Sequence, residues 1–576
     1  MKRAGPGGVP HRMAVLQAGL VLGLALVGAR SVQLALLDSR IAEWAEDQGT
    51  ATLAVAGERG RIYDRAGAEL AVSTLAPSVA ARPRAVVDRE ATARALARAL
   101  DRPAAELVER LGHPGPYVFL ARWVEPEVAE RVRRLGLPGI EITAEPRRSY
   151  PYGELAGQVL GFSNIDGRGV RGIERAEDGW LRGRSLRVPV ERAGKERFLW
   201  HPELDSASYA GGDIRLTLNA VLQAEAEAAL DETIRRTGAR GGVVVVLEPS
   251  TGELLALAEA PRFDPNRFRE VPYHATRARA FLDSFEAGST MKVFAVAAAL
   301  ERGVLRPGEQ LDCTPGSLLV GGRAIRDSSE HGVLPVTDVI RVSSNIGAAR
   351  IAARLGPRAH FEMLARFGFG RVTGSGFPEE SAGLMRPWQR WRPIDHATIA
   401  YGQGINVTPV QLAAATAALA NDGVLVPPRL VRARRLRDGR WTTEGPRPGR
   451  RVVRPEVARA VLAMMERAVE DGTGRRAGLP GVRVAGKTGT AQVLDPHMRR
   501  YTNRYDAWFV GVVPADAPEL VVAVLVEEPR RPHTGGAVAA PLFAEVARGE
   551  LLRRGLLSTP ARAAAASTRR PRAGTG

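Results

Sequence analysis

The sequence predicts an α/β protein in which an antiparallel sheet flanked by helices forms the main domain. A smaller, elongated N-terminal domain and one membrane-spanning helix precede it. Strand patterns open and close the region from residue 213 to residue 553, with helical patterns between them. The region before it mixes short strand patterns with turn signals. One stretch near the N-terminus is long, apolar and free of charge.

Composition limits the possible functions. The chain has 576 residues, of which 45% are hydrophobic and 25% charged, which is typical of a globular protein. Its net charge of +18 is spread along the whole length and is not interleaved with aromatic residues, so we expect no nucleic-acid partner. An anionic cell wall or membrane surface suits the charge equally well. The single cysteine, Cys313, excludes an intrachain disulfide, and no H-E-x-x-H pair occurs, so no metal or cofactor is predicted.

The apolar stretch near the N-terminus covers residues 13–29 and follows several basic residues. As a helix it spans about 25 Å, and the apolar residues just after it can extend that length toward a ~30 Å hydrocarbon core. The preceding positive charges predict a cytoplasmic N-terminus. We therefore expect a cytoplasmic tail at 1–12 and an uncleaved anchor at 13–37. A signal peptide cleaved after Ala29 is the alternative, and both interpretations export the rest of the chain.

The remaining chain divides into three predicted parts. Residues 50–212 form an N-terminal scaffold domain that includes a helical stretch at Arg89–Leu111 and carries no catalytic constellation. The main domain, 213–553, opens with a strand that enters a helix at Asp213–Leu230. Low-complexity sequence at 554–576 predicts a disordered tail.

The pattern of the main domain predicts a sheet that unites its two ends. A hairpin is followed first by two helical segments and then by three strand-like runs. The hairpin is Val243–Leu247 with Glu253–Ala258, and the helical segments are Ser289–Leu300 and Pro409–Asn421. The strand-like runs are Val482–Ala485, Ala507–Val513 and Leu520–Val526.

Lysine is rare in this chain. Of 81 cationic residues only Lys2, Lys195, Lys292 and Lys487 are lysine, and the others are arginine. Arginine does not deprotonate in a protein, whereas a buried lysine can shift its pKa and act as a base. Each lysine is therefore a place to look for amine chemistry.

Ser289-Thr290-Met291-Lys292 is the first motif that carries chemistry. A three-residue step on a helix brings the hydroxyl of Ser289 and the amine of Lys292 onto one face. A serine becomes a good nucleophile when a neighbouring base takes its proton, and a neutral lysine can do so. The tetrapeptide alone is common, but the scarcity of lysine makes an accident less plausible here.

Two further motifs follow in order. Ser343-Ser344-Asn345 offers a hydroxyl for relaying protons and an amide for binding a peptide, although alone it would read as a helix N-cap. Lys487-Thr488-Gly489-Thr490 follows a strand pattern, and Gly489 would let a substrate lie along that strand edge.

A P-loop pattern overlaps the third motif, because Gly481 to Thr488 fits G-x-x-x-x-G-K-[ST]. A phosphate-binding loop follows a buried strand and opens a helix. Here a turn precedes the pattern and Gly489 follows it, so a nucleotide-hydrolysing enzyme is not favoured. No G-x-S-x-G elbow occurs, which leaves a Ser-His-Asp hydrolase without support.

The three motifs in this order are the signature of penicillin-binding proteins and class A β-lactamases. The chain resembles the class B penicillin-binding proteins and, within them, the division-type (FtsI-like) transpeptidases. Asn345 favours the division type, because elongation-type relatives usually carry aspartate there. Further segments share the resemblance: Arg59–Arg65, Gly172–Glu174, Gly472–Gly474, Ala507–Gly511 and residues 535–543.

The resemblance implies a penicillin-binding-protein and β-lactamase-like transpeptidase fold on an elongated pedestal. It also implies that Ser289 attacks a D-Ala-D-Ala stem peptide and that an acyl-serine then passes to a neighbouring amine, closing a cross-link. The implied catalytic residues are Ser289, Lys292, Ser343, Asn345 and Lys487, and the implied substrate-binding residues are Thr488, Gly489 and Thr490.

The resemblance also implies partners and a location. The partners would be peptidoglycan stem peptides, β-lactams as inhibitors, an FtsW-type membrane glycosyltransferase and other division proteins. The chain would be a single-pass inner-membrane protein with its catalytic domain outside the cytoplasm, at the division septum. The alternatives are an elongation-type transpeptidase, a hydrolase (carboxypeptidase or β-lactamase), and a β-lactam sensor or scaffold without cross-linking activity.

The sequence departs from the family pattern in places. Pro378-Glu379-Glu380 stands where Pro-Gly-Glu is usual, which puts the shape of that loop in doubt. The insert Gln492–Tyr505, rich in Arg and Tyr, has no evident role.

Overall fold

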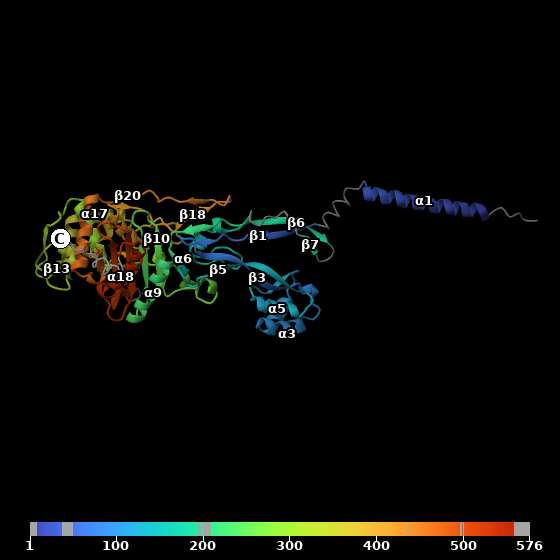
Figure 1. Ribbon diagram of the computed structural model, residues 1–576, viewed down its shortest axis with the longest axis horizontal. Coiled ribbons are helices and arrows are strands. Elements are labelled where there is room, and N and C mark those ends of the chain that lie inside the picture. Colours follow the sequence, from blue (N-terminus) through green and yellow to red (C-terminus); the bar gives the residue numbers. More distant parts are fainter. Residues whose placement is uncertain are drawn as a thin grey trace, which may run out of the picture. The chain divides into compact units, whose positions relative to one another are not determined.

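The computed structural model describes residues 9–36, 50–193, 197–199, 209–436, 438–495, 498 and 500–557 (Figure 1). Most of the predicted cytoplasmic tail and of the predicted disordered tail lies outside these residues. The chain divides into two compact units, one holding the residues up to Glu58 with Gly183–Ala210, the other Arg59–Arg182 with everything from Gly211.

The first unit contains the N-terminal helix α1 (Val9–Leu36). Its segment Met13–Gln33 has 21 residues and a mean hydropathy of 1.8, and is long and apolar enough to cross a membrane. A signal sequence passes the same test of length and composition. The same unit holds a three-stranded antiparallel sheet formed by β1 (Thr50–Ala56), β6 (Ser185–Ala193) and β7 (Arg197–Leu199).

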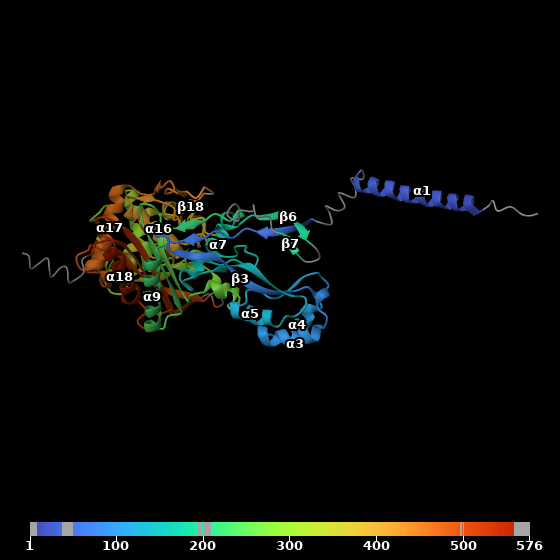
Figure 2. The same ribbon diagram turned by 45° about the vertical axis from the view of Figure 1, so that its right-hand side comes forward.

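A seven-stranded sheet opens the second unit, in the order β19-β18-β8-β2-β3-β4, with β5 paired to β3. Its strands are β2 (Ile62–Tyr63), β3 (Glu69–Ala81), β4 (Val118–Ala121), β5 (Ile140–Ser149), β8 (Ile214–Leu216), β18 (Val431–Arg435) and β19 (Trp441–Thr443). The helices α3 (Arg89–Leu100), α4 (Ala104–Leu111) and α5 (Pro126–Arg134) gather at one end of β3 (Figure 2). Their apolar faces and β3 share a small core that includes Val79, Leu96 and Leu107.

The helical stretch predicted at Arg89–Leu111 is two helices. Asp88 caps the first, because its side chain accepts a hydrogen bond from the backbone N–H of Ala91. Asp101 ends that helix in the left-handed conformation with φ +52°, and Pro103 precedes the next helix. A proline cannot continue a helix from the preceding turn, so the pattern breaks there.

Two segments that carried the family resemblance meet in the second unit. Arg59 Nε donates to Glu174 Oε2 at 2.5 Å, and Arg148 Nε donates to Glu174 Oε1 at 2.6 Å. Burial alone would raise the pKa of Glu174, but the charges of Arg148 and Arg59 outweigh it and hold that pKa below its usual value. This buried charge cluster joins strand β5 to the helix α7 (Gly172–Ala176).

The main sheet has five antiparallel strands in the order β10-β9-β23-β22-β21. Their bounds are β9 (Gly241–Leu247), β10 (Leu254–Ala260), β21 (Ala485–Asp495), β22 (Arg500–Val513) and β23 (Leu520–Glu527). Because β9 pairs with β23, strands from both ends of the domain lie side by side, which confirms the prediction from the sequence.

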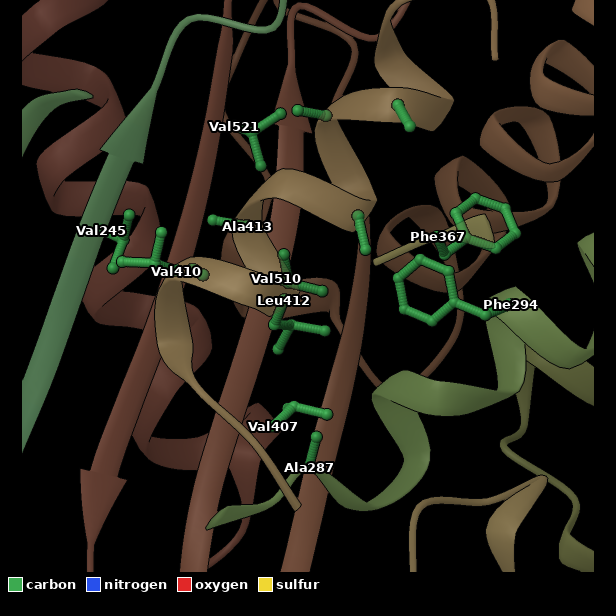
Figure 3. Close-up of a cluster of buried hydrophobic side chains, with 14 of the residues drawn as sticks. Val245, Ala287, Phe294, Phe367, Val407, Val410, Leu412, Ala413, Val510 and Val521 are labelled. Carbon is green, nitrogen blue, oxygen red and sulfur yellow. The ribbon is translucent and has the colours of Figure 1, made fainter. Parts of the chain in front are cut away.

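Helices cover both faces of this sheet. On one face, α9 (Ala220–Thr237) and α18 (Gly535–Arg553) lie side by side (Figure 1). They pack on buried valines of β9 and β23 and on Phe509 of β22. On the other face, α16 (Pro409–Ala420) inserts Val410 and Leu412 against Val245 and Val510 (Figure 3). All twelve residues of α16 are buried, so it is the central helix of the domain.

Two predicted boundaries are wrong by a few residues. The strand predicted at Val482–Ala485 begins only at Ala485. Arg483 is held instead by two hydrogen bonds to Glu466, while its carbonyl accepts the backbone N–H of Ala515. The helix predicted from Ser289 begins as a 3₁₀ turn, η5 (Gly288–Met291), and becomes the α-helix α11 (Lys292–Glu301) afterwards.

The two departures from the family pattern take definite shapes. Glu379 adopts φ +60°, a conformation that favours glycine. Its carboxylate pairs with both Arg171 and Arg175, which ties this loop to α7. The insert Gln492–Tyr505 lengthens the β21–β22 hairpin, in which Leu494 pairs with Tyr501, although residues 496, 497 and 499 lie outside the described part.

Candidate active site

A cleft of about 600 Å³ brings the three sequence motifs together. Its walls come from η5, from the start of α13 (Asn345–Leu355), from β21 and from the start of α18. The lining residues are Ser289, Ser328, Val342, Ser343, Asn345, Gly472, Thr473, Arg475, Arg476, Thr488, Thr490, Thr534, Gly536 and Ala537.

Ser289 lies in a tightly packed turn. Gly288 has φ +54°, and a Cβ there would lie 3.1 Å from the carbonyl oxygen of Thr490. Gly402 faces the same turn from behind, where a Cβ would lie 2.1 Å from the carbonyl oxygen of Gly288. Glycine suits both positions, because φ is positive at each (+54° at Gly288 and +86° at Gly402) and a side chain would crowd the neighbouring backbone.

Both lysines of the motifs are fully buried and share one partner. Lys292 Nζ donates to Ser343 Oγ at 3.1 Å, and Lys487 Nζ donates to the same oxygen at 3.0 Å. Lys292 Nζ also donates to Asn345 Oδ1 at 2.8 Å and to the carbonyl of Ser343. The Ser343 hydroxyl therefore links the first motif to the third.

The Ser289 hydroxyl stands apart from this network. In the part of the chain that the structure describes, the hydrogen bonds of Lys292 run to Ser343 and Asn345 and none joins it to Ser289. Such bonds are often long in an unliganded site and tighten when the substrate binds. The geometry leaves Ser289 as a half-buried hydroxyl that opens onto the cleft.

The third motif lies inside strand β21 at the free edge of the main sheet. Thr488 is buried, and its hydroxyl hydrogen-bonds that of Thr473 at 2.8 Å, whereas exposed Thr490 accepts the backbone N–H of Gly535 at 3.1 Å. A Cβ at Gly489 would lie 2.5 Å from the carbonyl oxygen of Ala287, so only glycine fits there. A continuous strand through this motif also excludes the P-loop, which must open a helix.

Several cleft residues were not singled out as site residues by the sequence. Thr473 lies in one of the segments that resemble the family, Gly472–Gly474. The local sequence around Ser328, Thr534, Arg475 and Arg476 contains no pattern that marks them as site residues. Within the described residues, no cluster of three His, Cys, Asp or Glu could hold a metal ion.

Comparisons with known proteins identify the family. Residues 242–548 match the penicillin binding protein transpeptidase domain, and residues 54–216 match the penicillin-binding protein dimerisation domain. A relative named peptidoglycan D,D-transpeptidase FtsI, from Escherichia coli, is 34% identical over 556 residues, covering 94% of this chain and 92% of the relative. The chain belongs to the class B penicillin-binding proteins, in the FtsI family.

Other comparisons agree with this family. Penicillin-binding protein PbpB of Mycobacterium tuberculosis is 36% identical over 471 residues, covering 78% of this chain and 68% of the relative. A crystal structure of penicillin binding protein 3 from the same organism, complexed with aztreonam, has 30% identity and a TM-score of 0.68. It covers 88% of this chain and 98% of that one.

The site of this penicillin-binding protein favours a neutral amine. Burial lowers the pKa of Lys292 well below its usual value and the charge of Lys487 lowers it further, while Asp327 acts in the opposite direction. Burial also lowers the pKa of Lys487 to about 7. Two ammonium groups on one hydroxyl would repel each other in this buried setting, which favours the neutral form of Lys292.

Proposed function

We propose that this class B penicillin-binding protein is a septal peptidoglycan D,D-transpeptidase that works through an acyl-serine at Ser289. The observation that carries the proposal is the pair of buried lysines on Ser343 Oγ, at 3.1 Å and 3.0 Å, beside the Ser289 turn. A base of lowered pKa next to a serine is the arrangement that activates a hydroxyl nucleophile.

Acylation uses the first motif. Lys292 takes the proton of Ser289 as Oγ attacks the penultimate D-Ala carbonyl of a stem peptide. The backbone N–H groups of Ser289 and Thr490 stabilise the oxyanion, commonly the largest contribution to such catalysis. The close approach of the Gly288 backbone to Thr490 supports this assignment.

Transfer completes the cycle. Ser343, with Lys487, returns a proton to the departing terminal D-Ala, and Asn345 binds the peptide backbone of the substrate. Thr488 and Thr490 hold the substrate carboxylate, while Gly489 lets the peptide lie along β21 as an added strand. An amine of a neighbouring stem then attacks the acyl-serine, which closes the cross-link and restores the Ser289 hydroxyl.

Organisation and partners follow from the same proposal. Residues 50–212 serve as the pedestal and 213–553 as the transpeptidase domain, which the family matches at 54–216 and 242–548 support. Residues 1–12 are a cytoplasmic tail and 13–37 a membrane anchor, so the catalytic domain lies outside the cytoplasm. The partner is an FtsW-type membrane glycosyltransferase with other division proteins, and β-lactams acylate Ser289 in place of the stem peptide.

Cross-linking by the purified full chain tests the reaction. Supplied with nascent glycan and a glycosyltransferase that makes it, the protein should produce cross-linked muropeptide dimers, and penicillin should stop their formation. A chain that only removes the terminal D-Ala would be a carboxypeptidase. A chain that binds penicillin but leaves the glycan unchanged would be a sensor or scaffold.

Localisation of the fluorescently tagged full chain in dividing cells tests the septal role. We expect a band at mid-cell that appears as constriction begins. An even distribution along the lateral wall would contradict the division role and favour elongation.

A further inference from the structure

Asp327 lies outside all three motifs and follows directly on strand β14 (Arg323–Arg326). It is half-buried, and its neighbour Ser328 lines the cleft. By sequence alone it is an ordinary acid in a polar loop. Its contacts in the fold are what single it out.

The carboxylate of Asp327 holds the second motif and the residue that follows it at three points. Oδ2 accepts the hydroxyl hydrogen of Ser344 at 2.6 Å, while Oδ1 accepts the backbone N–H groups of Asn345 and, at 3.1 Å, Ile346. Ser344 Oγ in turn accepts the backbone N–H of Gly347 at 2.9 Å. Asp327 and Ser344 together satisfy the first free N–H groups of α13, which a helix cannot satisfy by itself.

Ser343 immediately precedes the residues that Asp327 holds (344–346, the Asp327 clamp), and its backbone is strained. Ser343 has φ +64°, in the left-handed region that residues with a Cβ rarely adopt. Such a conformation persists only when the surroundings fix it, and it concentrates at functional sites. Here the surroundings are the Asp327 clamp on one side and the two lysines that donate to Ser343 Oγ on the other.

The amide of Asn345 is oriented by the same strand end. Its Nδ2 donates to the carbonyl of Arg326 at 2.9 Å, which leaves Oδ1 to accept from Lys292. Ser343 and Asn345, on either side of Ser344, therefore both present an oxygen to Lys292, and Asn345 is fixed by its contacts with Arg326 and Asp327.

Asp327 also carries charge into the site. The charged groups that act on Lys292 are Lys487 of β21 and Asp327, and their effects are opposite in sign. The other groups in contact with the Lys292 amine, Ser343 and Asn345, are neutral. The carboxylate is therefore the negative charge that opposes the effect of Lys487 on Lys292.

We propose that Asp327 is a positioning residue of the acylation reaction. It holds the Ser343–Asn345 turn so that Ser343 Oγ and Asn345 Oδ1 face Lys292, and it places a negative charge at the start of α13. The inference rests on the proposed function, because it concerns the same site.

Asp327→Asn tests the proposal by removing the charge and keeping the shape. The measurement is the rate constant for acylation of the full chain by a fluorescent penicillin, taken from about pH 5 to about pH 9 to record its pH dependence. The wild-type rate should fall as the pH drops, because Lys292 takes up a proton. In the variant the rate near neutral pH should fall about 10- to 100-fold, as expected for a displaced catalytic group.

The acid limb is the low-pH part of the curve of rate against pH, where the rate falls as Lys292 takes up a proton. The position of this limb separates a positioning role from a merely structural one. Without the negative charge the pKa of Lys292 falls further, so the limb should move to lower pH. Glu330→Gln is the matched control, since it removes an exposed carboxylate from the same segment and should leave rate and limb unchanged. A variant whose rate falls only in proportion to its folded fraction, with the limb unmoved, would overturn the proposal.

Ser344→Ala provides a second test if Asp327→Asn does not fold. It breaks the clamp from the other side and keeps the charge, so the rate should fall while the limb stays in place. A wild-type rate in Ser344→Ala would overturn the proposal. The proposed function fails separately, if the wild-type chain is not acylated at Ser289.

Discussion

Ser289→Ala should leave the chain unlabelled by a fluorescent penicillin while the fold is retained. The β-lactam ring opens only when a nucleophile attacks its carbonyl, and alanine has no oxygen to form the ester. The fold should survive, because Ser289 is half-buried at the cleft wall and the α-helix that follows it starts at Lys292. The measurements are gel fluorescence after labelling and the melting temperature of the unlabelled protein.

Ser328→Ala is the control for that experiment. Ser328 lines the same cleft but is exposed and lies outside the three motifs, so its variant should label normally. Labelling of Ser289→Ala at the wild-type level would show that another residue is the nucleophile, and the proposed mechanism would then be wrong.

Lys292→Arg should reduce acylation by about 10²- to 10⁴-fold, the range that a general base usually contributes. Arginine stays protonated in a protein, so it cannot take the proton of Ser289. Its larger planar head must also fit a fully buried position where Lys292 contacts Ser343 and Asn345. The rate constant for acylation by the fluorescent penicillin reports the loss.

Two further variants make the lysine result interpretable. Lys195→Arg makes the same chemical change at a lysine outside the motifs and should leave the rate unchanged. Lys292→Met removes the amine without adding a charge, so a correctly folded Lys292→Met should be as slow as Lys292→Arg. Near-normal acylation of Lys292→Met would refute Lys292 as the base.

The sequence predicted the candidate reactive residues of the site, but it did not predict the residue that holds the second motif in place. Ser289, Lys292, Ser343 and Lys487 could be singled out as candidates because their residue types are tied to one reaction and lysine is scarce elsewhere, and the fold brings them to one site. Asp327 could not be found, because its role arises from contacts with Ser344 and the start of α13 that only the folded chain creates.

The fold was predictable where local patterns decide it and unpredictable where distant partners do. Apolar runs predicted the strands of the main sheet, because a buried strand needs an apolar side chain on each covered face. β21 starts two residues after Arg483, whose side chain pairs with Glu466 in α17 (Pro455–Glu470), a contact that no local pattern reveals. Glu379 likewise keeps its left-handed backbone beside Arg171 and Arg175, which lie about 200 residues earlier in the sequence.

We expect the pairing of β9 with β23 to be completed late in folding. Contacts between residues so far apart in the chain form late, because a long loop must close before they are made. All three motifs lie before residue 491, yet the strand that joins the two halves of the sheet is Leu520–Glu527. A chain that stopped between those two points would contain every reactive group of the enzyme, but the sheet that brings them together would be incomplete.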